Sequence, residues 1–287
     1  MDVSAISSER RDDWTEVQNY IRAMDEALEV GNELPFSSRL IRMIHAPLMA
    51  GVRGQHKGPG EFRRSQNWIG GAGPDNAQFV PPPHTGIGAL MSDLEKFAND
   101  PNNLLPPLLK IALIHYQFET IHPFQDGNGR TGRLLITLFL VKEEILQKPI
   151  LYLSAFLERN RLDYYEKLTA VREHNDLRGW FLFFLEGVEQ TAADGVQTFR
   201  RITRLQREIP ERLRELGGRA GRALLLVRHL YRRPVMTIAQ VSEVIEATYP
   251  TAHRLVQDLV KLDLLRPVNA SGRGQHYVFW EYLSLFR

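Results

Sequence analysis

The chain has 287 residues, of which 43% are hydrophobic and 24% charged, a composition typical of soluble globular proteins. It has no cysteine, which excludes disulfide bonds, thiolate nucleophiles and Cys-ligated zinc. The 36 basic and 34 acidic residues nearly balance, so net charge gives no reason to expect binding to nucleic acid or to a membrane. The charged N-terminus lacks the apolar stretch of a signal peptide, and the longest apolar run, residues 134–141, is too short to span a bilayer. We therefore expect a cytoplasmic protein with no membrane partner.

Apolar residues at spacings of three and four predict helices along most of the chain. The first two helices cover residues 14–28 and 37–49. Glycines interrupt the pattern between residues 51 and 73, where the alternation of residues 61–69 predicts a short exposed hairpin. The proline-rich segment 79–84 follows, and we interpret it as a rigid connector rather than a docking motif.

The middle of the chain is strongly helical. Prolines 106 and 107 suit the first turn of a helix, where an amide hydrogen is not needed. The segment 130–146 is apolar almost all round, which predicts a helix in the middle of the core. The helices predicted here cover residues 91–98, 106–121, 130–146, 151–160, 163–174 and 178–190, followed by a long amphipathic segment that reaches residue 216.

A domain boundary is expected at Gly217 and Gly218. Beyond it come a short helix over 237–245, a second helical segment over 247–265, and short alternating runs over 266–280 around a glycine-containing turn. This order is the outline of a winged helix-turn-helix.

The second helix of this C-terminal module could enter a major groove, because its outward face carries His253, Arg254, Gln257 and Lys261. Cationic residues are few, however, and Asp258 lies among them. DNA binding and a protein-docking or dimerising role both remain open.

Residues 122–133, HPFQDGNGRTGR, have the composition of a phosphate site. Gly127, Asn128 and Gly129 allow backbone amides to approach an anion at the start of the next helix, whose dipole favours bound phosphate. Arg130 and Arg133 are one helical turn apart, so both guanidinium groups can reach one polyphosphate.

Two further side chains of the loop have chemistry suited to such a site. Asp126 offers a hard oxygen ligand for Mg²⁺ shared with the phosphate. His122 is the nearby group able to take a proton near neutral pH, and it lies at the expected C-terminus of the preceding helix.

Three competing motifs fit less well. Residues 127–132 match a dinucleotide fingerprint in letters only, because no strand precedes them and no βαβ pattern surrounds them. A P-loop sequence is absent. The spacing of His115, Glu119 and His122 suggests a metal cluster, but the proline after His122 breaks the helical register, which favours a core or solvent-facing role for the first two.

The stretch HPFQDGNGRTGR resembles the signature of Fic-domain proteins, H-P-F-x-[DE]-G-N-G-R-x-x-R, at every fixed position. GEFRRSQNWIGG is similar to the flap hairpin of that family, and NRLDYYEKLTAVRE to its helix beside the adenine. The resemblance implies a mainly α-helical fold, with a Fic core, a short β-hairpin flap and a C-terminal winged helix. The implied domains are an N-terminal helical segment (1–36), the Fic catalytic domain (37–190), a linker helix (191–216) and the winged helix-turn-helix (217–287).

The resemblance also implies an enzyme that transfers AMP from ATP to a Ser, Thr or Tyr hydroxyl of a protein, including itself. His122 would be the general base, and Asp126 would hold Mg²⁺ across the phosphates. The amides of residues 127–129, with the Asn128 side chain, would line the anion site, and Arg130 and Arg133 would hold the β- and γ-phosphates.

Other roles implied by the resemblance concern the flap and the adenine helix. Gln66, Asn67, Trp68 and Ile69 would pair with the target segment as an added strand, although a plain surface hairpin with Trp68 packed on the core is an equal alternative. Tyr164 and Arg172 would contact adenine and ribose, whereas Tyr165 is expected in the core.

Many relatives carry an inhibitory motif, [ST]-x-x-x-E-[GN], whose glutamate pairs with the second motif arginine. Ser4-Ala5-Ile6 resembles its beginning, but Ser7-Ser8 follows and no Glu-Gly stands at the motif spacing, and Ser242 to Glu246 matches only the spacing. We expect Arg133 to have no inhibitory partner in this chain. The alternative function is a DNA-binding regulator with an inactive Fic core as a nucleotide sensor. A homodimer and a phosphocholine or other nucleotide donor also remain open.

Overall fold

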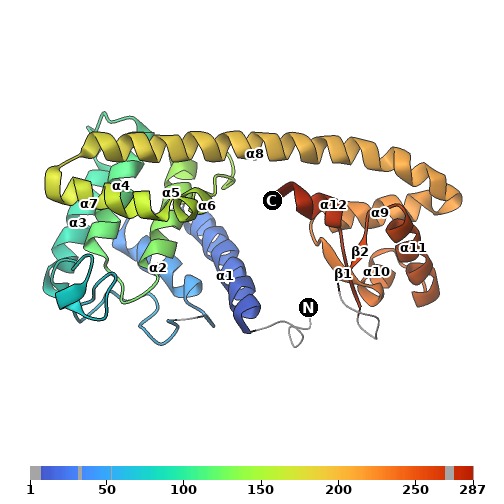
Figure 1. Cartoon of the computed structure of the whole chain (residues 1–287), viewed down its shortest axis with the longest axis horizontal. Coiled ribbons are helices and arrows are strands. Elements are labelled where there is room, and N and C mark those ends of the chain that lie inside the picture. Colours follow the sequence, from blue (N-terminus) through green and yellow to red (C-terminus); the bar gives the residue numbers. More distant parts are fainter. Residues whose placement is uncertain (1–7, 32–33, 53, 269–274, 287) are drawn as a thin grey trace. The chain divides into compact units, whose positions relative to one another are not determined.

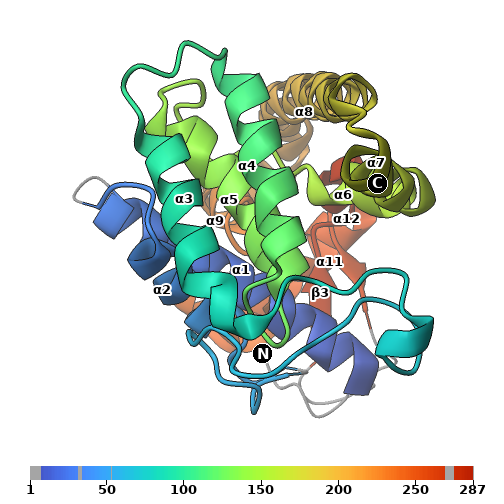
Figure 2. The ribbon, with the colours of Figure 1, turned by 90° about the vertical axis from the view of Figure 1, so that its left-hand side faces the viewer.

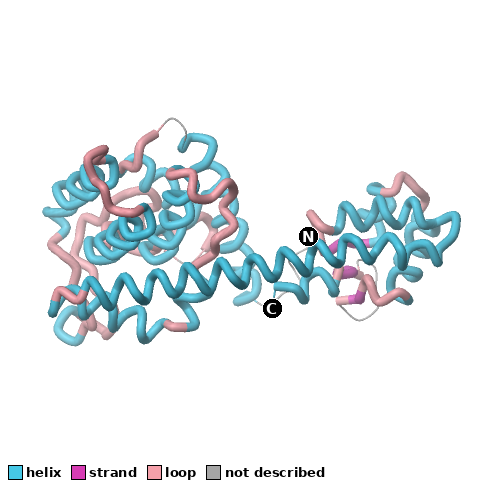
Figure 3. Tube along the Cα trace, turned by 90° about the horizontal axis from the view of Figure 1, so that it is seen from above, coloured by secondary structure: helices cyan, strands magenta, loops and turns pink. Residues whose placement is uncertain are grey.

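The computed structural model describes residues 8–31, 34–52, 54–268 and 275–286, and it is mainly helical (Figure 1). The chain divides into two compact units, residues 1–192 and 193–287. Among the described residues, strands occur only in the second unit (Figure 3). None of the described helices has the length and apolar character needed to cross a membrane.

The N-terminal unit consists of helices in the segments where the sequence predicts them. Their bounds are α1 Ser8–Gly31, α2 Ser38–Leu48, α3 Ile87–Asn99, α4 Pro107–Ile121, α5 Asn128–Lys142, α6 Ser154–Arg159, α7 Arg161–His174 and the first part of α8 Leu177–Leu213. The expected helix over 130–146 begins earlier, at Asn128, and ends earlier, because Glu144 adopts a positive φ of 57°. Ser37 caps α2, where its side chain accepts a hydrogen bond from the Leu40 amide.

Helices α4 and α5 form the centre of this unit. Figure 2 shows α3 and α4 side by side with α5 behind them, and α5 also packs against α1 and α2. Seven consecutive residues of α5, 134–140, are buried, which confirms the expectation of a central helix. The loop between α4 and α5 is therefore anchored at both ends by core helices.

The segment between α2 and α3 is irregular, and the expected hairpin is reduced to one isolated bridge between Ile69 and Phe79. The chain turns sharply at Gly70 and Gly71, both with positive φ. Prolines 81–83 lack the amide hydrogens that a longer ladder would need. The flap, which we define as residues 61–83, is thus a folded-back loop rather than a pair of strands.

Helix α8, Leu177–Leu213, is continuous. The sequence predicts a helix over residues 178–190 and a separate amphipathic segment after it. The last part of α8 belongs to the second unit, where Leu205, Ile209 and Leu213 are buried in a separate core. The limits expected at residues 36, 190 and 216 remain predictions.

The second unit combines short helices with a three-stranded antiparallel sheet of order β1-β3-β2. Val235 pairs with Val278 on one side of β3, and Arg266 pairs with Val278 on the other. The glycine-containing turn expected between β2 and β3 lies outside the described residues. The bounds are α9 Ala220–Leu230, β1 Val235–Thr237, α10 Ile238–Val244, α11 Tyr249–Lys261, β2 Arg266–Pro267, β3 His276–Val278 and α12 Trp280–Leu283.

Candidate functional site

A tight loop joins α4 to α5 and carries motif residues 122–127. His122 caps the C-terminus of α4 in the left-handed conformation, with φ of 49°, and its amide donates to the Phe118 carbonyl at 2.9 Å. Gly127 precedes α5 with φ of 79°, and a Cβ there would lie 2.5 Å from Met49 Sδ. Only glycine fits at this position, because any side chain would be both strained and blocked.

Two motif residues fix the shape of the loop from inside. Phe124 is fully buried. The Asn128 side chain accepts from the Phe124 amide at 2.8 Å and donates to the Phe124 carbonyl at 2.7 Å. Both ends of this amide are therefore used to close the loop. The expectation that the Asn128 side chain lines an anion site stays a prediction, and the structure adds that this side chain closes the loop.

His45 braces the loop from α2, a function that sequence reasoning missed. Its ring stacks on Phe124 with 3.7 Å between centroids. The Gly60 amide donates to Nδ1 at 2.8 Å, so Nε2 carries the hydrogen and donates to the Asp126 carbonyl at 2.9 Å. Burial lowers the pKa of His45 to about 4, which keeps it neutral and preserves this arrangement.

The first turn of α5 provides the groups expected for an anion site. The amides of Asn128 and Gly129 have no carbonyl partner within the helix, because they belong to its first turn. The Gly127 amide donates instead to Asp126 Oδ1 at 2.7 Å. A Cβ at residue 129 would lie 3.0 Å from Arg133 Nη1, so the glycine leaves room for that guanidinium group.

Asp126 is partly exposed and surrounded by cations. Its Oδ2 lies 3.4 Å from Lys57 Nζ, and its Oδ1 lies 3.8 Å from Arg130 Nη2. In the described part of the chain, no three His, Asp or Glu residues are grouped closely enough to hold a metal ion. One carboxylate beside a helix N-terminus is a donor set that suits Mg²⁺ when phosphate oxygens supply further ligands.

Arg130 and Arg133 border the same hollow, which has a volume of about 210 Å³. Arg130 Nη1 lies 3.2 Å from Glu16 Oε1 of α1, and its Nη2 lies 3.2 Å from Met49 Sδ. The hollow is lined by Glu16, Val17, Tyr20, Leu48, Arg130, Arg133, Tyr152, Ser154 and Glu158.

The expectation about inhibition concerns Arg133. Within the residues that the structure describes, Arg133 forms no hydrogen bond and no ion pair. Among the side chains of α1 that the structure describes, Glu16 contacts Arg130. The segment Ser4 to Ser7 lies outside the described residues, so the expectation for Arg133 remains a prediction.

His122 has one buried and one accessible side. Its Nδ1 is buried and lies 3.9 Å from Glu119 Oε2, beyond hydrogen-bonding distance. Burial lowers the pKa of His122 to about 4, with smaller contributions from Arg63 and Arg172. The imidazole is therefore neutral near pH 7, and because Nδ1 is enclosed, Nε2 is the nitrogen available to accept a proton.

Arg63 anchors the flap to this loop, and sequence reasoning also missed it. The side chain is buried, with 4% exposure, and its Nε donates to the His122 carbonyl at 3.0 Å. Other guanidinium hydrogens reach the carbonyls of Ser65, Pro82 and Ile121. Its own amide donates to the Pro123 carbonyl at 2.8 Å. Charged residues in a glycine-rich segment are typical of a solvent-exposed turn, so the sequence around Arg63 does not indicate that its side chain is buried.

The four flap residues expected to dock a target differ in exposure. Gln66 Nε2 donates to the Pro81 carbonyl at 2.8 Å, and the buried Asn67 Nδ2 donates to the Phe124 carbonyl at 3.0 Å. Ile69 forms the single bridge with Phe79. Trp68 is exposed by 42%, so of these four side chains it is the one presented to solvent.

The two residues expected to contact adenine and ribose, Tyr164 and Arg172, differ in how deeply their side chains are buried. Tyr164 is a core residue whose hydroxyl lies 3.0 Å from His115 Nε2, and it packs against Trp180. Its assignment to the nucleotide site stays a prediction, which this burial does not favour. Tyr165, expected in the core, is only half-buried. Arg172 stays at the surface of the loop region, with its Nε 3.3 Å from Thr120 Oγ1 and its Cζ 3.6 Å from the centroid of the Phe79 ring.

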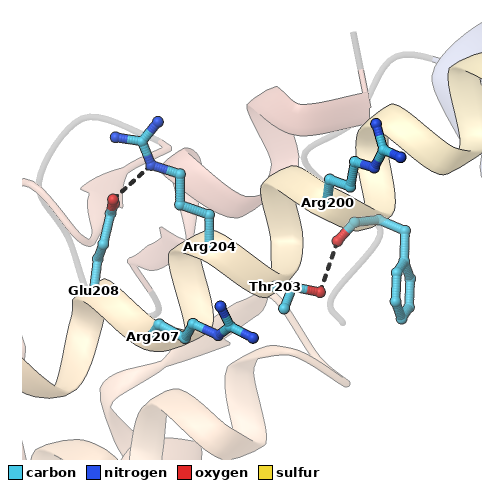
Figure 4. A pocket seen from close by; sticks show the side chains of 6 residues that line it. Arg200, Thr203, Arg204, Arg207 and Glu208 are labelled. Carbon is cyan, nitrogen blue, oxygen red and sulfur yellow. Dashed lines mark hydrogen bonds and ion pairs between the residues drawn. The ribbon is translucent and has the colours of Figure 1, made fainter.

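A second hollow, of about 540 Å³, lies along α8 in the other unit (Figure 4). Its wall combines basic side chains with one ion pair, between Arg204 and Glu208. It contains no histidine and no helix N-terminus, so it lacks the groups for acid–base chemistry found at the loop. The lining residues are Phe199, Arg200, Thr203, Arg204, Arg207 and Glu208.

Comparison with known sequences finds a family match within the N-terminal unit. Residues 35–140 match the Fic/DOC family. The chain is 35% identical over 133 residues to "Protein adenylyltransferase Fic" from Aedes aegypti, and 34% identical over 133 residues to the protein of the same name from Drosophila melanogaster. These alignments cover 46% of this chain, but the chain spans only about a quarter (24%) of the length of those relatives.

Solved structures agree at the level of the fold. A Fic family protein from Desulfovibrio desulfuricans matches 92% of this chain and 74% of its own, with a TM-score of 0.56 and 22% identity. Fic-1 from C. elegans matches 70% of this chain and 55% of its own, with a TM-score of 0.54 and 21% identity. The sequence match to the Fic/DOC family includes the complete loop between α4 and α5, so the part of the chain that carries this loop resembles a Fic domain in both sequence and fold.

Proposed function

We propose that this protein is an adenylyltransferase that transfers AMP from ATP to a hydroxyl side chain of a protein. The observation that carries the proposal is the placement of His122, a neutral imidazole with one nitrogen enclosed, beside the first turn of α5. The names of the curated relatives, which are protein adenylyltransferases, support the same reaction class.

In this proposal His122 is the general base. Its Nε2 accepts the proton of the target hydroxyl as the oxygen forms a bond to the α-phosphorus of ATP. The bond between the α-phosphorus and the bridging oxygen breaks, and pyrophosphate leaves with that electron pair. A pKa near 4 makes His122 a weak base in the free protein, so the incoming negative charge of ATP would be needed to raise it.

The remaining groups bind and neutralise the triphosphate. The amides of Asn128 and Gly129 would contact the phosphate nearest the helix, and Arg130 and Arg133 the outer phosphates. Mg²⁺ would supply charge neutralisation between phosphate oxygens, with Asp126 as its protein ligand. Phosphoryl-type transfer depends mainly on this positioning and on charge.

The flap would position the target. The Gln66 and Asn67 side chains are engaged within the protein, so the target segment would contact the exposed Trp68 and the adjacent backbone. A hydroxyl presented there would face the loop to which Arg63 ties the flap.

The test is to incubate the protein with Mg²⁺, a cell lysate and ATP labelled at either the α- or the γ-phosphate. Transfer of AMP predicts label in protein from α-labelled ATP and none from γ-labelled ATP, which also excludes a kinase. Mass spectrometry of the labelled peptide identifies the residue type. Equal labelling from both positions, or none beyond that of His122→Ala, would refute the proposal.

For the second unit we propose a winged helix-turn-helix that docks protein rather than DNA. The order of α9, α10 and α11 with a small antiparallel sheet supports that fold. On α11, Asp258 pairs with Arg219, and Arg266 of β2 pairs with Asp263, so part of the cationic charge is already neutralised. A salt-dependent mobility shift on duplex DNA at low ionic strength would contradict the docking role.

A further inference from the structure

Glu119 is a buried carboxylate behind His122 that the transfer mechanism above does not use. It lies in the last turn of α4 with 6% exposure. Its Oε1 is buried and has no hydrogen-bond partner among the described residues, and the same holds for Nδ1 of His122. The other carboxylate oxygen, Oε2, lies 3.9 Å from that Nδ1. The carboxylate of Glu119 and the ring of His122, each with one buried atom that lacks a partner, therefore lie close together in the interior, which is costly unless they serve each other.

A glycine in the neighbouring helix leaves space for the carboxylate group of Glu119. A Cβ on Gly132 of α5 would lie 2.5 Å from Glu119 Oε1. Gly132 has an ordinary helical conformation in the middle of α5, where glycine is unfavourable compared with alanine. It is not a fixed position of the family signature, and a Cβ here would also lie 3.2 Å from His115 Cε1 and from Phe118 Cδ1, so the side chains of α4, with Glu119 the nearest, are the local reason for a glycine.

His115, the other histidine of this cluster, is not available to Glu119. Its Nδ1 lies 3.1 Å from the Gly132 carbonyl and its Nε2 lies 3.0 Å from the Tyr164 hydroxyl. Both nitrogens are thus used in holding α4, α5 and α7 together. His122 is left as the one imidazole that can turn toward the carboxylate in this part of the described structure.

Burial and the surrounding charges place the protonation of Glu119, beside His122, near neutral pH. Burial raises the pKa of Glu119 to about 7, and Arg133 and Arg172 oppose that rise. The backbone carbonyl of Glu119 also acts on the His122 ring and raises its pKa. The titratable and charged groups that face the pair are His115 of α4, Arg133 of α5, Tyr164 and Arg172 of α7, Arg63 of the flap, and Asp126 of the loop.

We propose that Glu119 is the positioning residue of His122, and that its ionised carboxylate accepts a hydrogen bond from Nδ1–H. This would hold the ring with Nε2 toward the target hydroxyl and would stabilise the imidazolium formed when that nitrogen takes the proton. The contact must shorten by about 1 Å to reach a charge-assisted hydrogen bond, a change that occurs when substrates tighten a site. The catalytic part of the inference rests on the proposed AMP transfer; the tautomer part does not.

The experiment compares Glu119→Gln, Glu119→Ala and wild type, with Glu166→Gln on the exposed face of α7 as the matched control. Long-range ¹⁵N–¹H NMR spectra at pH 8 report which nitrogen of His122 carries the hydrogen, and a His122→Ala spectrum assigns its signals. Gln can still accept from Nδ1–H without a charge, whereas Ala cannot. We expect the Nδ1–H tautomer in wild type and Glu119→Gln, and a redistributed population in Glu119→Ala.

Transfer kinetics then test the charge. In wild type, kcat for self-labelling should rise about tenfold between pH 6 and pH 8, as a group with a pKa near 7 ionises. In Glu119→Gln this step should disappear and kcat at pH 8 should fall roughly 10- to 100-fold, with little change in the KM for ATP. Glu166→Gln should match wild type.

The rival acceptor is the Glu119 backbone carbonyl, which all variants retain. If the His122 tautomer in Glu119→Ala equals that of wild type, the carbonyl alone holds the ring and the proposal is wrong. It is also overturned if the pH step survives in Glu119→Gln. If no variant and no wild-type protein transfers AMP, yet the tautomer changes in Glu119→Ala, the proposed function fails while the positioning by Glu119 stands.

Discussion

Arg63 and His122 are 59 residues apart in the sequence, yet Arg63 Nε donates to the backbone carbonyl of His122 at 3.0 Å. The same guanidinium group also binds the carbonyls of Ser65 and Pro82. One buried cation therefore fixes both the residue that caps the C-terminus of α4 and the two ends of the flap. The position of the proposed base is thus coupled to the loop that would present the target.

Replacing Arg63 should damage both stability and transfer. Arg63→Lys retains the charge but cannot reach several carbonyls from one planar group. We expect a loss of about 3 kcal/mol in the free energy of unfolding, because buried carbonyls lose charged donors. Arg64→Lys is the control, since Arg64 is exposed and should change stability by less than about 0.5 kcal/mol. Urea unfolding of the two variants decides this, and equal stabilities would contradict the role of Arg63.

His122→Ala should abolish transfer while leaving ATP binding. We expect kcat to fall by at least about 100-fold, because a general base is removed and no phosphate-binding group is touched. Calorimetric titration with ATP and Mg²⁺ should give an affinity close to that of wild type. His84→Ala, at an exposed position, is the matched control. AMP labelling by His122→Ala at the wild-type rate would remove His122 from the mechanism.

The ion pair between Glu16 and Arg130 should have little influence on activity. The Arg130 side chain is 19% exposed but that of Glu16 is 44% exposed, so solvent reaches the pair and screens it. Glu16→Gln should therefore change self-labelling by less than about threefold. Glu29→Gln, on an exposed part of α1, is the control. Stimulation of tenfold or more by Glu16→Gln alone would show that α1 restrains the site, against the expectation of an enzyme without an inhibitory glutamate.

The N-terminal unit should lose stability in mild acid. Burial lowers the pKa values of His45, His115 and His122 to about 4. Because these folded-state values lie below the unfolded value of about 6.5, the unfolded chain binds more protons between pH 6.5 and 4. The stability contributed by each neutral histidine is therefore present above pH 6.5 and lost as pH falls through 4, by on the order of 2 kcal/mol each.

This pH dependence can be measured by urea unfolding in a Trp280→Phe background, which leaves tryptophans only within residues 1–192. The free energy of unfolding should fall from pH 7 to pH 4.5, because the three histidines outweigh Glu119, whose pKa of about 7 makes the folded protein take up one proton in this range. His45→Gln should reduce the slope by about one proton, whereas His84→Gln should not. A flat profile for the parent protein would show that the buried imidazoles do not resist protonation.

The helices and the motif could be predicted from local patterns. Apolar spacing identified α2, α4 and α7 closely, and the run of apolar residues 134–140 was correctly expected in the core. These predictions succeed because the periodicity of a helix and the demand for glycine at a left-handed turn depend on residues near each other in sequence. The extent of α8 was not predicted, because its two halves pack in different cores although the helix is continuous.

By itself, the sequence determined the helical class and the chemistry gathered in residues 122–133. Only the tertiary structure decided which polar side chains are buried together. No local pattern marks Arg63, His45 and Glu119 as buried, because segments that are distant in sequence enclose them. Tyr164 is likewise buried because it packs against Trp180. The reason is physical: burial and the hydrogen bonds that satisfy it join residues far apart in the chain, so no local pattern encodes them.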